Sequence, residues 1–272
     1  MPKVSVIIPC YNQGQYLDEA VQSVLAQSCD DFEIIIVNDG STDEFTNDLL
    51  SSYRGEKINV IHTANQGLAE ARNTGIRAST GRYILPLDAD DKIGAVYLAE
   101  AAKVLDAAPE TGIVYCEAEY FGEKTGKWDL PPYSFEKMLR ENKIFCSAFF
   151  RREDYDATCG YDPKMIHGLE DWDFWLSLLE LGKKVYRIPK TLFYYRIRAN
   201  SMVNTLDEEK YAYLRERIYR NHITLYMQHF PDPLNLYWET TNLRHELERV
   251  YNSNDYQIGS RIMKVLRYIK IK

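Results

Sequence analysis

The sequence predicts an α/β protein whose sheet is mostly parallel and doubly wound, with a helical extension at its C-terminal end. Two observations carry this prediction. Short apolar runs of strand length alternate with segments of helical periodicity through the first half of the chain, which is typical of repeated strand–helix units. The last quarter shows helical periodicity alone. With 272 residues, the chain is long enough for one large domain and an appendage.

The first half of the chain contains four apolar runs that alternate with three helical segments. Most of the runs are rich in Val, Ile or Leu without polar alternation, which indicates strands buried on both faces. Dense turn residues separate the runs from the helices that follow them. The predicted strands are Val4–Ile8, Glu33–Val37, 58–62 and Ile84–Leu87, and the predicted helices are 15–27, 44–53 and 68–76.

A polar loop follows each of these four predicted strands. In a doubly wound sheet, ligands bind at the carboxyl ends of the strands, near the point where the strand order reverses. We therefore expect the four loops to converge on one binding edge. A Gly-x-Gly-x-x-Gly pattern and a Gly-Lys-Ser/Thr loop are both missing, which argues against a dinucleotide oxidoreductase and a phosphate-loop NTPase. The loops are 9–12, 38–43, 65–67 and 88–91.

Three carboxylates lie within the last of these loops, at Asp88, Asp90 and Asp91. Like charges at close range raise each other's pKa, and a divalent cation relieves that repulsion. Asp88 and Asp90 point to the same side of an extended chain, and oxygen ligands of this kind suit Mg²⁺ or Mn²⁺. The alternative is a polar turn that caps the next helix. We expect a cation site at Asp88 and Asp90, and a helix-cap role for Asp91.

The bulk composition indicates a folded cytoplasmic protein. Hydrophobic residues make up 45% and charged residues 27% of the chain, which argues against disorder. The net charge of −7 argues against nucleic-acid binding. Five scattered cysteines without metal-ligand spacing favour a reducing compartment. The run Val4–Ile8 is too short for a signal-peptide core, and no run approaches the ~20 apolar residues of a spanning helix.

The middle of the chain is less regular and contains a second acidic pair. Glu170 and Asp171 begin a helix marked by Trp172 and Trp175. Acidic residues at a helix N-terminus are favourable without any catalytic role, so this simpler interpretation stays open. Around this helix we expect a helix over 95–105, strands over 112–116 and 147–151, a hairpin or insertion over 117–145, an edge strand over 183–189, and a loop over 194–202 with two guanidinium groups.

Residues 206–272 form the predicted helical extension, after a first domain over residues 1–205. Two helices are expected, around Tyr211–Ile218 and Leu236–Val250. The tail Gly259–Lys272 interleaves five basic residues with apolar ones and contains no acid. On an acidic protein this pattern favours attraction to an anionic membrane surface, at the inner face of the cell membrane. The alternative is a helix that packs on the domain with a solvated basic face.

Taken in order, five stretches and a trailing Tyr195-Arg196 resemble the inverting family-2 glycosyltransferases with the GT-A fold. The resemblance covers about the first 200 residues and is strongest for bacterial enzymes that extend polysaccharide or lipopolysaccharide chains. Each stretch alone is a weak signal, whereas the ordered set is specific. The stretches are Val4–Asn12, Ile34–Asp43, Asn65–Gly81, Tyr83–Asp91 and Gly168–Trp175.

The resemblance implies a nucleotide-sugar donor, with UDP typical, a Mg²⁺ or Mn²⁺ ion, and a glycan or lipid-linked glycan as acceptor. It implies a single displacement in which the acceptor hydroxyl attacks the anomeric carbon and an α-linked donor gives a β-linked product. By position, the resemblance implies that Pro9 and Tyr11 border the nucleobase and that Asp39 accepts a hydrogen bond from it. It implies that Gly67 lets the backbone approach the nucleotide and that Arg72 lies near the diphosphate or orients the acidic loop. It also implies that Asp88 contacts the ribose or the metal, that Asp90 ligates the metal, and that Asp171 is the catalytic base.

One position departs from the family pattern. Many relatives carry a histidine a few residues after the Tyr-Arg pair, and the nearest equivalent here is Arg198. A guanidinium cannot ligate a metal, but it can pair with phosphate. We therefore expect Arg198 to neutralise the leaving diphosphate.

Two other function classes were weighed. A nucleotidyltransferase of sugar-nucleotide synthesis would need a basic, Gly-rich loop after the first strand, and Pro9–Gly14 contains no Lys or Arg. A non-catalytic nucleotide- or glycan-binding relative would be favoured by loss of Asp90 or Asp171, and both are present. The sequence carries no signal for an oligomeric state.

Overall fold

The computed structural model describes residues 3–198, 206–230 and 232–270. It divides into two compact units, Met1–His222 and Ile223–Lys272. The sequence analysis placed the boundary after residue 205. The helix that follows, α8 (Glu208–Asn221), belongs to the first unit.

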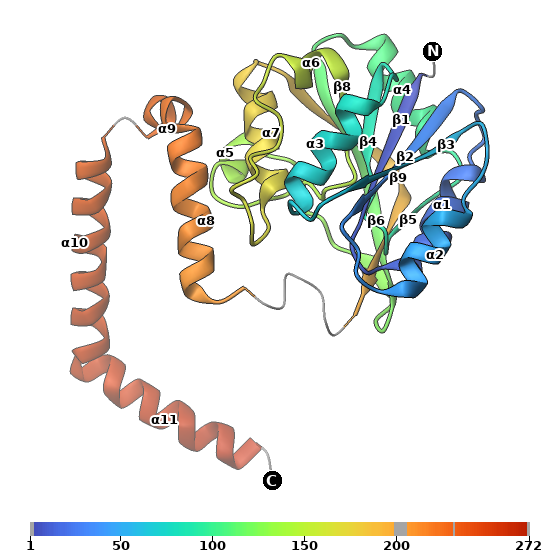
Figure 1. The fold of residues 1–272 in the computed structure, drawn as a ribbon. Helices are drawn as coiled ribbons and strands as arrows, with labels where there is room; N and C mark the ends of the chain where they lie inside the picture. Colours follow the sequence, from blue (N-terminus) through green and yellow to red (C-terminus); the bar gives the residue numbers. More distant parts are fainter. Residues whose placement is uncertain (1–2, 199–205, 231, 271–272) are drawn as a thin grey trace. The chain divides into compact units, whose positions relative to one another are not determined.

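The first half of the sheet is parallel, as predicted (Figure 1). Strand β1 lies between β2 and β4, with Val6 opposite both Ile34 and Leu85, and β3 lies outside β2. Every residue of β1 is buried, because helices and loops cover the sheet. Such continuous burial explains why these strands read as unbroken apolar runs. The strands are β1 (Val4–Cys10), β2 (Phe32–Asp39), β3 (Ile58–Thr63) and β4 (Tyr83–Pro86).

The second half of the sheet is mixed. Strand β8 (Phe149–Arg151) runs antiparallel between β4 and β6 (Thr111–Gly122), which confirms the strand predicted to return to the sheet. Strand β7 (Gly126–Trp128) forms a hairpin with β6, as one of the two alternatives for this region predicted. Strand β9 (Lys184–Ile197) pairs in parallel with β6.

The edge-like strand predicted over 183–189 corresponds to the start of β9, which pairs with β6; the short strand β5 (Lys92–Ile93) pairs with β9 further along, at Phe193 and Tyr194. The loop predicted from residue 194 was wrong: the chain is strand as far as Ile197, because Tyr195–Ile197 continue to pair with β6. The remainder of that predicted loop, residues 199–202, lies outside the described residues.

Helices connect the strands and pack on the sheet. Helix α3 packs against β1 and β2, where Gly75 allows a close approach: an added Cβ would lie 2.4 Å from Ile7 Cγ2. Helix α2 begins at the predicted turn, where the Asp43 carboxylate accepts from Thr46 N at 2.8 Å and so caps the helix. The helices are α1 (Gly14–Leu25), α2 (Glu44–Ser52), α3 (Leu68–Ala78), α4 (Tyr97–Ala107), α5 (Phe135–Met138), α6 (Arg152–Asp156) and α7 (Glu170–Glu180).

Helix α8 is held to the first unit by buried apolar and polar contacts. Leu214 and Ile218 are buried. At the end of α8, the His222 ring lies between two carboxylates of α7, with Nε2 3.3 Å from Asp173 Oδ1 and Nδ1 3.0 Å from Glu180 Oε2. These contacts explain why α8 belongs with the first unit rather than with the extension.

His222 should make the stability of the first unit depend on pH. Burial opposes its charge, but the carboxylates of Asp173 and Glu180 prevail and raise its pKa. The stabilisation is therefore complete below the unfolded pKa of about 6.5 and is lost as the pH rises through the higher folded value. We expect His222→Gln to lower the melting temperature most at about pH 5, with the difference shrinking towards about pH 9. Exposed His245 supplies the control, His245→Gln; a pH-independent deficit for His222→Gln would contradict this account.

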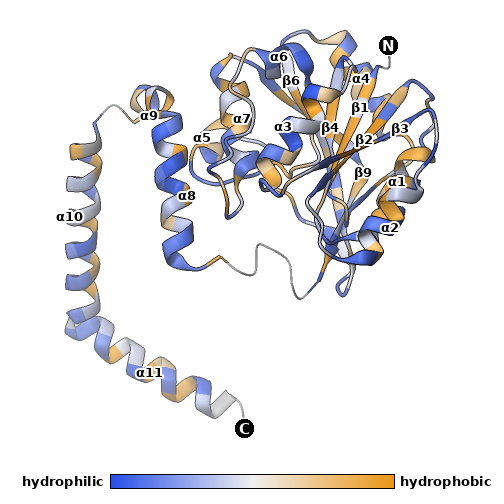
Figure 2. Cartoon of the chain, in the orientation of Figure 1, coloured by the Kyte–Doolittle hydropathy of each residue, from blue (hydrophilic) through white to orange (hydrophobic). Residues whose placement is uncertain are grey.

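The second unit is helical, as predicted for the extension. Figure 2 shows hydrophobic and hydrophilic residues interspersed along its two long helices, α10 (Pro233–Asn252) and α11 (Asn254–Lys270). A short helix, α9 (Ile223–His229), precedes them. Helix α11 begins before the predicted tail, and residues 271–272 of that tail lie outside the described residues. Among the described helices, none combines the length and hydropathy of a membrane-spanning segment.

Candidate functional site

The four polar loops converge at one edge of the sheet, as the sequence predicts. The parallel register places Cys10 opposite Asn38 and Asp39 opposite Thr63, so the carboxyl ends of β1, β2 and β3 lie side by side. Strand β4 ends beside β1 and leads into the acidic loop 88–91. Hydrogen bonds between the loops then fix their relative positions.

Asn12 joins the loops that follow β1 and β2. Its Oδ1 accepts from Thr42 N at 2.7 Å and from Asp43 N at 3.2 Å, and its own backbone N–H donates to Ser41 Oγ at 3.0 Å. This role of Asn12 was not predicted from the sequence. Its neighbour Tyr11, a predicted nucleobase contact, is 46% exposed.

The other predicted nucleobase contact, Pro9, lies within β1 and is buried opposite Val37. Pro9 is therefore covered, whereas the Tyr11 ring is the exposed ring of this loop.

Asp39 is nearly buried at the end of β2, and it fixes the turn after β3. Its Oδ1 accepts from Gln66 N at 2.9 Å, and its Oδ2 accepts from Gly67 N at 2.9 Å. Gly67 has φ +90°, which side-chain-bearing residues rarely adopt, and open space surrounds the position of a Cβ. The two predicted nucleotide-binding residues thus form one unit, with an open surface above the glycine.

Arg72 links the acidic loop to the start of α7. It is 1% exposed, and its Nη2 donates to Asp88 Oδ1 at 2.6 Å while its Nη1 donates to Glu170 Oε1. These two carboxylates are 82 positions apart in the sequence, so a single buried guanidinium joins two of the predicted site segments. The sequence predicted that Arg72 could orient the acidic loop, but it did not identify Glu170 as its second partner.

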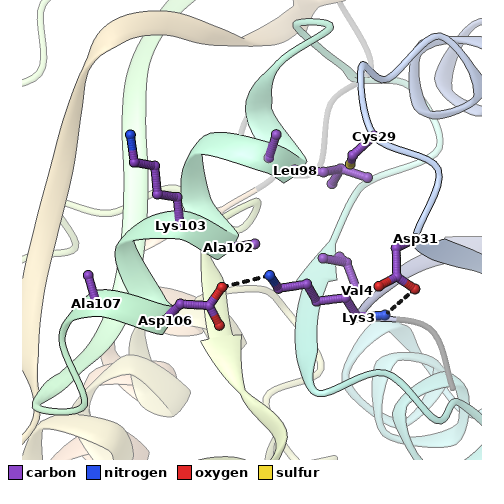
Figure 3. A pocket seen from close by; sticks show the side chains of 10 residues that line it. Lys3, Val4, Cys29, Asp31, Leu98, Ala102, Lys103, Asp106 and Ala107 are labelled. Atoms are coloured by element: carbon purple, nitrogen blue, oxygen red, sulfur yellow. Dashed lines mark hydrogen bonds and ion pairs between the residues drawn. The ribbon is translucent and has the colours of Figure 1, made fainter.

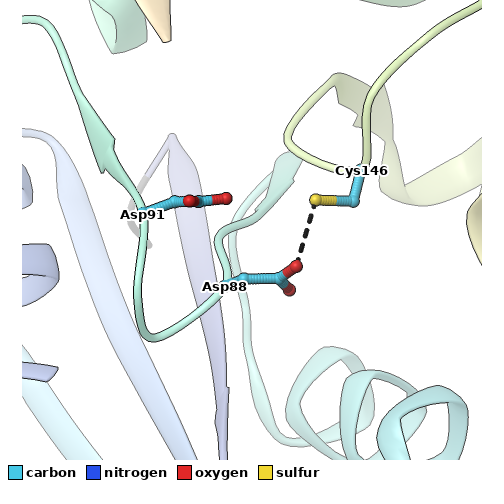
Figure 4. Close-up of side chains that lie close together, drawn as sticks. All are labelled: Asp88, Asp91 and Cys146. Atoms are coloured by element: carbon cyan, nitrogen blue, oxygen red, sulfur yellow. Dashed lines mark hydrogen bonds between the residues drawn. The ribbon is translucent and has the colours of Figure 1, made fainter. Parts of the chain in front are cut away.

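Asp88, Asp91 and Cys146 form a compact cluster next to this link (Figure 4). Cys146 Sγ donates to Asp88 Oδ2 at 3.3 Å. Burial, and then the nearby Asp88, raise the pKa of the Cys146 thiol well above its usual value, so the thiol carries its proton at neutral pH. Cys146 comes from the segment before β8, which the sequence did not associate with the site.

Asp91 is not a helix cap, and that expectation was wrong. Helix α4 begins at Tyr97 with Val96 at its N-cap position, because β5 intervenes between the acidic loop and the helix. Asp91 is instead 1% exposed and accepts from Arg196 N at 2.8 Å through Oδ1. Burial, and then Asp90, raise its pKa well above the usual value.

Asp90 is paired with Arg198, the residue that departs from the family pattern. Arg198 Nε lies 2.8 Å from Asp90 Oδ2. Burial and the neighbouring Asp88 raise the pKa of Asp90, and Arg198 opposes that rise. Arg196 Nε also donates to the backbone oxygen of Asp90 at 2.8 Å. The end of β9 and the residue that follows it thus supply two guanidinium groups to the acidic loop.

Asp171 lies in the first turn of α7, where its carboxylate is held by two donors. Asn142 Nδ2 donates to its Oδ2 at 2.9 Å, and Trp172 N donates to its Oδ1 at 2.8 Å. Burial and the adjacent Glu170 raise its pKa to about 7, while Arg72 opposes the rise. Such a pKa suits a group that accepts a proton near neutral pH.

Backbone strain also marks this edge of the sheet. Among the described residues, two non-glycine residues have positive φ: Asn12 at 52° and Leu169 at 59°. Asn12 joins two of the site loops, and Leu169 is the N-cap of α7, directly before Glu170. Strained backbone of this kind clusters at functional sites.

A cavity of about 650 Å³ lies elsewhere, beside the first residues of β1 and along α4 (Figure 3). Three of its four charged lining residues are already paired, since Lys3 Nζ donates to Asp106 at 2.6 Å and Lys3 N donates to Asp31 at 3.0 Å. None of the predicted site residues lines it. The side-chain chemistry therefore favours the loop edge over this cavity.

The chain also matches a family model and several known proteins. A family model described as glycosyl transferase family 2 matches residues 5–165. The putative teichuronic acid biosynthesis glycosyltransferase TuaG of Bacillus subtilis is 34% identical over 211 residues, which cover 74% of this chain and 81% of TuaG. The uncharacterized glycosyltransferase EpsJ of the same organism is 29% identical over 74% of this chain, which spans 63% of EpsJ.

A similar fold is found in S. aureus TarS, residues 1–349, solved in complex with UDP-GlcNAc. The TM-score is 0.67 at 20% identity, over 80% of this chain and 66% of the TarS chain. This likeness confirms the predicted GT-A fold.

Proposed function

Because the chain belongs to glycosyl transferase family 2, we propose that it transfers a sugar from a nucleotide-sugar donor to a hydroxyl group of a glycan or lipid-linked glycan, with inversion at the anomeric carbon. The observation that carries the proposal is the buried Arg72, which holds the acidic loop through Asp88 and the start of α7 through Glu170. Arg72 thereby fixes the position of the acidic loop, proposed to bind the diphosphate, relative to the start of α7, where the proposed proton acceptor lies.

A UDP-sugar is the proposed donor. TarS has been solved with UDP-GlcNAc, and its fold matches this chain. In the proposed complex, the exposed Tyr11 ring stacks on the base, and Asp39, although it already accepts from Gln66 N and Gly67 N, retains lone pairs that can accept from a base N–H. The open surface above Gly67 leaves room for the nucleotide backbone.

The acidic loop fits a Mg²⁺ or Mn²⁺ ion, with Asp90 and Asp88 as the proposed ligands. Both supply oxygen donors, which these ions prefer. Burial, and then the nearby Asp88, raise the pKa of Asp90, so the loop carries a repulsion that a cation would relieve. When bound, the ion would stabilise the negative charge that develops on the leaving diphosphate. Arg198 already occupies Asp90 Oδ2, so it must move aside or share that carboxylate.

Asp171 is the proposed catalytic base. The acceptor hydroxyl attacks the anomeric carbon from the face opposite the leaving diphosphate, and Asp171 removes the hydroxyl proton as the new bond forms. Asn142 fixes one carboxylate oxygen and the backbone of Trp172 the other, which orients the group. A single displacement needs no covalent sugar intermediate, so no enzyme nucleophile is required.

Thermal unfolding with UDP, GDP and CMP, each with and without Mn²⁺, tests the donor site. We expect a rise in melting temperature with UDP that is larger when Mn²⁺ is present, because a ligand that binds only the folded state stabilises it. The same measurement on Asp90→Asn should lose the Mn²⁺-dependent part. Failure of all three nucleotides to shift the wild-type melting temperature would contradict the proposal.

Arg198 should act on the donor rather than on the metal. Once released from Asp90, its guanidinium can pair with the diphosphate. We expect Arg198→Ala to lower kcat/KM for the donor about ten- to a hundredfold, the loss of one charge-assisted hydrogen bond, without weakening Mn²⁺ binding. Steady-state kinetics and Mn²⁺ titration check both parts. Arg220→Ala, which removes a 73% exposed guanidinium, is the control; unchanged donor kinetics in Arg198→Ala would exclude this role.

We also propose that α11 binds an anionic membrane surface and so holds the protein at the cytoplasmic face of the membrane. Its basic residues Arg261, Lys264 and Arg267 are exposed. The apolar residues between them are exposed as well, which leaves both faces of an amphipathic helix available. These apolar residues are Ile262, Met263, Val265 and Leu266.

Reversal of three charges on α11 should abolish this membrane binding. Each basic residue near an anionic surface contributes about 1 kcal/mol, so replacing Arg261, Lys264 and Arg267 by Glu should weaken binding to phosphatidylglycerol vesicles by at least about a hundredfold. Vesicle sedimentation measures this. The control reverses three exposed lysines of the first unit, Lys103, Lys124 and Lys137. Equal loss in both triple variants, or equal binding to neutral phosphatidylcholine vesicles, would contradict the proposed role.

A further inference from the structure

We propose that Cys146, Asp88 and Asp91 form a binding site for a thiophilic divalent cation such as Zn²⁺, which shares Asp88 with the Mg²⁺ or Mn²⁺ site proposed at Asp90 and Asp88. One ligand atom from each of the three side chains lies within 4.8 Å of the other two. The three residues come from two segments, the acidic loop after β4 and the segment before β8. Figure 4 shows the three side chains directed towards one another.

The buried carboxylate of Asp91 indicates that the cluster could hold a ligand. It is 1% exposed, and its Oδ1 is used by Arg196 N. Its Oδ2 is buried and has no hydrogen-bond partner among the described residues. An unpartnered carboxylate oxygen is costly in a protein interior, since its desolvation is uncompensated. A cation bound between the three side chains would supply the missing partner.

Asp88 and Cys146 supply the other two ligands with little rearrangement. Asp88 uses Oδ1 for Arg72 and directs Oδ2 to the Cys146 thiol, at 3.3 Å from Sγ. Two ligands around a tetrahedral Zn²⁺, with Zn–S of about 2.3 Å and Zn–O of about 2.0–2.2 Å, are separated by about 3.5 Å. The Sγ–Oδ2 pair already has nearly this separation, so the ion would mainly need to draw Asp91 inward.

The thiol determines which ion binds. Mg²⁺ and Mn²⁺ prefer oxygen ligands, whereas a thiolate selects Zn²⁺ and softer ions such as Cd²⁺. On binding, the S–H bond breaks, its proton leaves to solvent, and the sulfur electron pair forms the bond to the metal. No change of oxidation state is involved. One thiolate and two carboxylates leave a fourth position for water, as in open zinc sites.

The site differs from the proposed nucleotide-linked site in its ligands. Asp90 is paired with Arg198 and contributes no atom to the cluster. Asp88 is the shared residue, through its Oδ2. The inference does not depend on the proposed sugar transfer, because it concerns metal binding by the protein alone.

Cd²⁺ titration of the reduced protein, followed by ultraviolet thiolate-to-metal charge transfer, tests the site. We expect the wild type to develop the band at one equivalent and to lose it when excess Zn²⁺ is added. Cys146→Ser and Cys146→Ala should both lack the band. The double variant Cys29→Ser, Cys159→Ser is the matched control, because it removes the two other cysteines that are not fully buried and should keep the band.

A second variant tests the carboxylate. Asp91→Asn keeps an oxygen that can accept from Arg196 N, so the fold should persist, but it removes the anionic ligand. We expect it to weaken Zn²⁺ binding by more than about tenfold, the lower limit seen for residues that only orient a metal ligand. Competition with a chromophoric zinc indicator measures this in the absence of nucleotide and acceptor.

Two results would overturn the inference: a charge-transfer band that survives both Cys146 substitutions, or Zn²⁺ affinity that is unchanged in Asp91→Asn. Either result would assign the bound metal to other groups and leave Asp91 as a buried, protonated carboxyl. The proposed sugar transfer would be untouched by these results, since its tests use UDP and Mn²⁺. Conversely, loss of the transfer proposal would leave the Cd²⁺ and Zn²⁺ measurements intact.

Discussion

Replacement of Asp171 by asparagine should lower the transfer rate by about 10²–10⁴-fold, the usual contribution of a general base. Asparagine has nearly the same shape and keeps an oxygen for Trp172 N, but it cannot accept the acceptor's proton. UDP binding should persist, because Asp171 lies on α7 and not on the loops that receive the nucleotide. Initial rates and a UDP thermal shift, measured on the same preparation, separate the two effects. Equal losses of both would indicate a folding defect and contradict the assigned role.

The pH dependence of the wild type supplies a second readout of Asp171. Burial and the adjacent Glu170 raise its pKa to about 7. A base must be ionised to act, so kcat should fall as the pH drops below about 7. Glu170→Gln removes a neighbouring negative charge and should move this acidic limb to lower pH. A limb that stays in place in Glu170→Gln would show that another group titrates.

Replacement of Arg72 by leucine should destabilise the first unit by about 3–5 kcal/mol, because it leaves two carboxylates near the interior without their shared cation. Arg72 is 1% exposed, and its partner side chains Asp88 and Glu170 are 26% and 6% exposed. Solvent therefore screens this pair of contacts weakly. Urea unfolding followed by circular dichroism measures the loss.

Arg77→Leu is the matched control for this prediction. Arg77 lies on the same helix, α3, and pairs with Glu70 at 2.6 Å, but its side chain is 56% exposed. Surface ion pairs contribute about 0–1 kcal/mol, so Arg77→Leu should have a small effect. The triple variant Arg72→Leu, Asp88→Asn, Glu170→Gln should recover part of the stability, because it also removes the two unpaired carboxylate charges. An Arg72→Leu loss no greater than the control's would refute the buried-link account.

The first half of the fold could be predicted from the sequence because its strands are buried on both faces. Val4–Ile8 and Glu33–Val37 read as unbroken apolar runs for that reason, and the structure extends each by only a few residues. Strand β9 was harder, since its residues vary from exposed to buried and its partner β5 has two residues. Pairing between distant segments, rather than local pattern, decides where such a strand ends.

The part of the candidate site that lies at strand ends could also be predicted from the sequence. Residues at the ends of buried strands, such as Asp39 and Asp88, could be found because the topology itself brings those positions together. Contacts across long sequence separations could not. The pairing of Arg72 with Glu170 and the approach of Cys146 to Asp88 leave no local pattern, and Asp91 was misassigned because β5 is too short to recognise. The signal that could have suggested a buried acidic partner is Arg72, the single charged residue among the buried positions of α3.

In the proposed reaction, this site cleaves a nucleotide-sugar, and Asp171 removes the proton from the attacking hydroxyl group. The most direct test of this reaction is the release of the nucleotide from a panel of UDP-, GDP-, dTDP- and CMP-linked sugars with Mn²⁺; the nucleotide is a diphosphate for the first three and CMP for the last. The anomeric configuration of the freed or transferred sugar is read by proton NMR. We predict that a UDP-sugar releases its nucleotide and that the sugar first formed has inverted configuration. The release should be lost in Asp171→Asn and Asp90→Asn. Retained configuration, or release that is unchanged in both variants, would contradict the account.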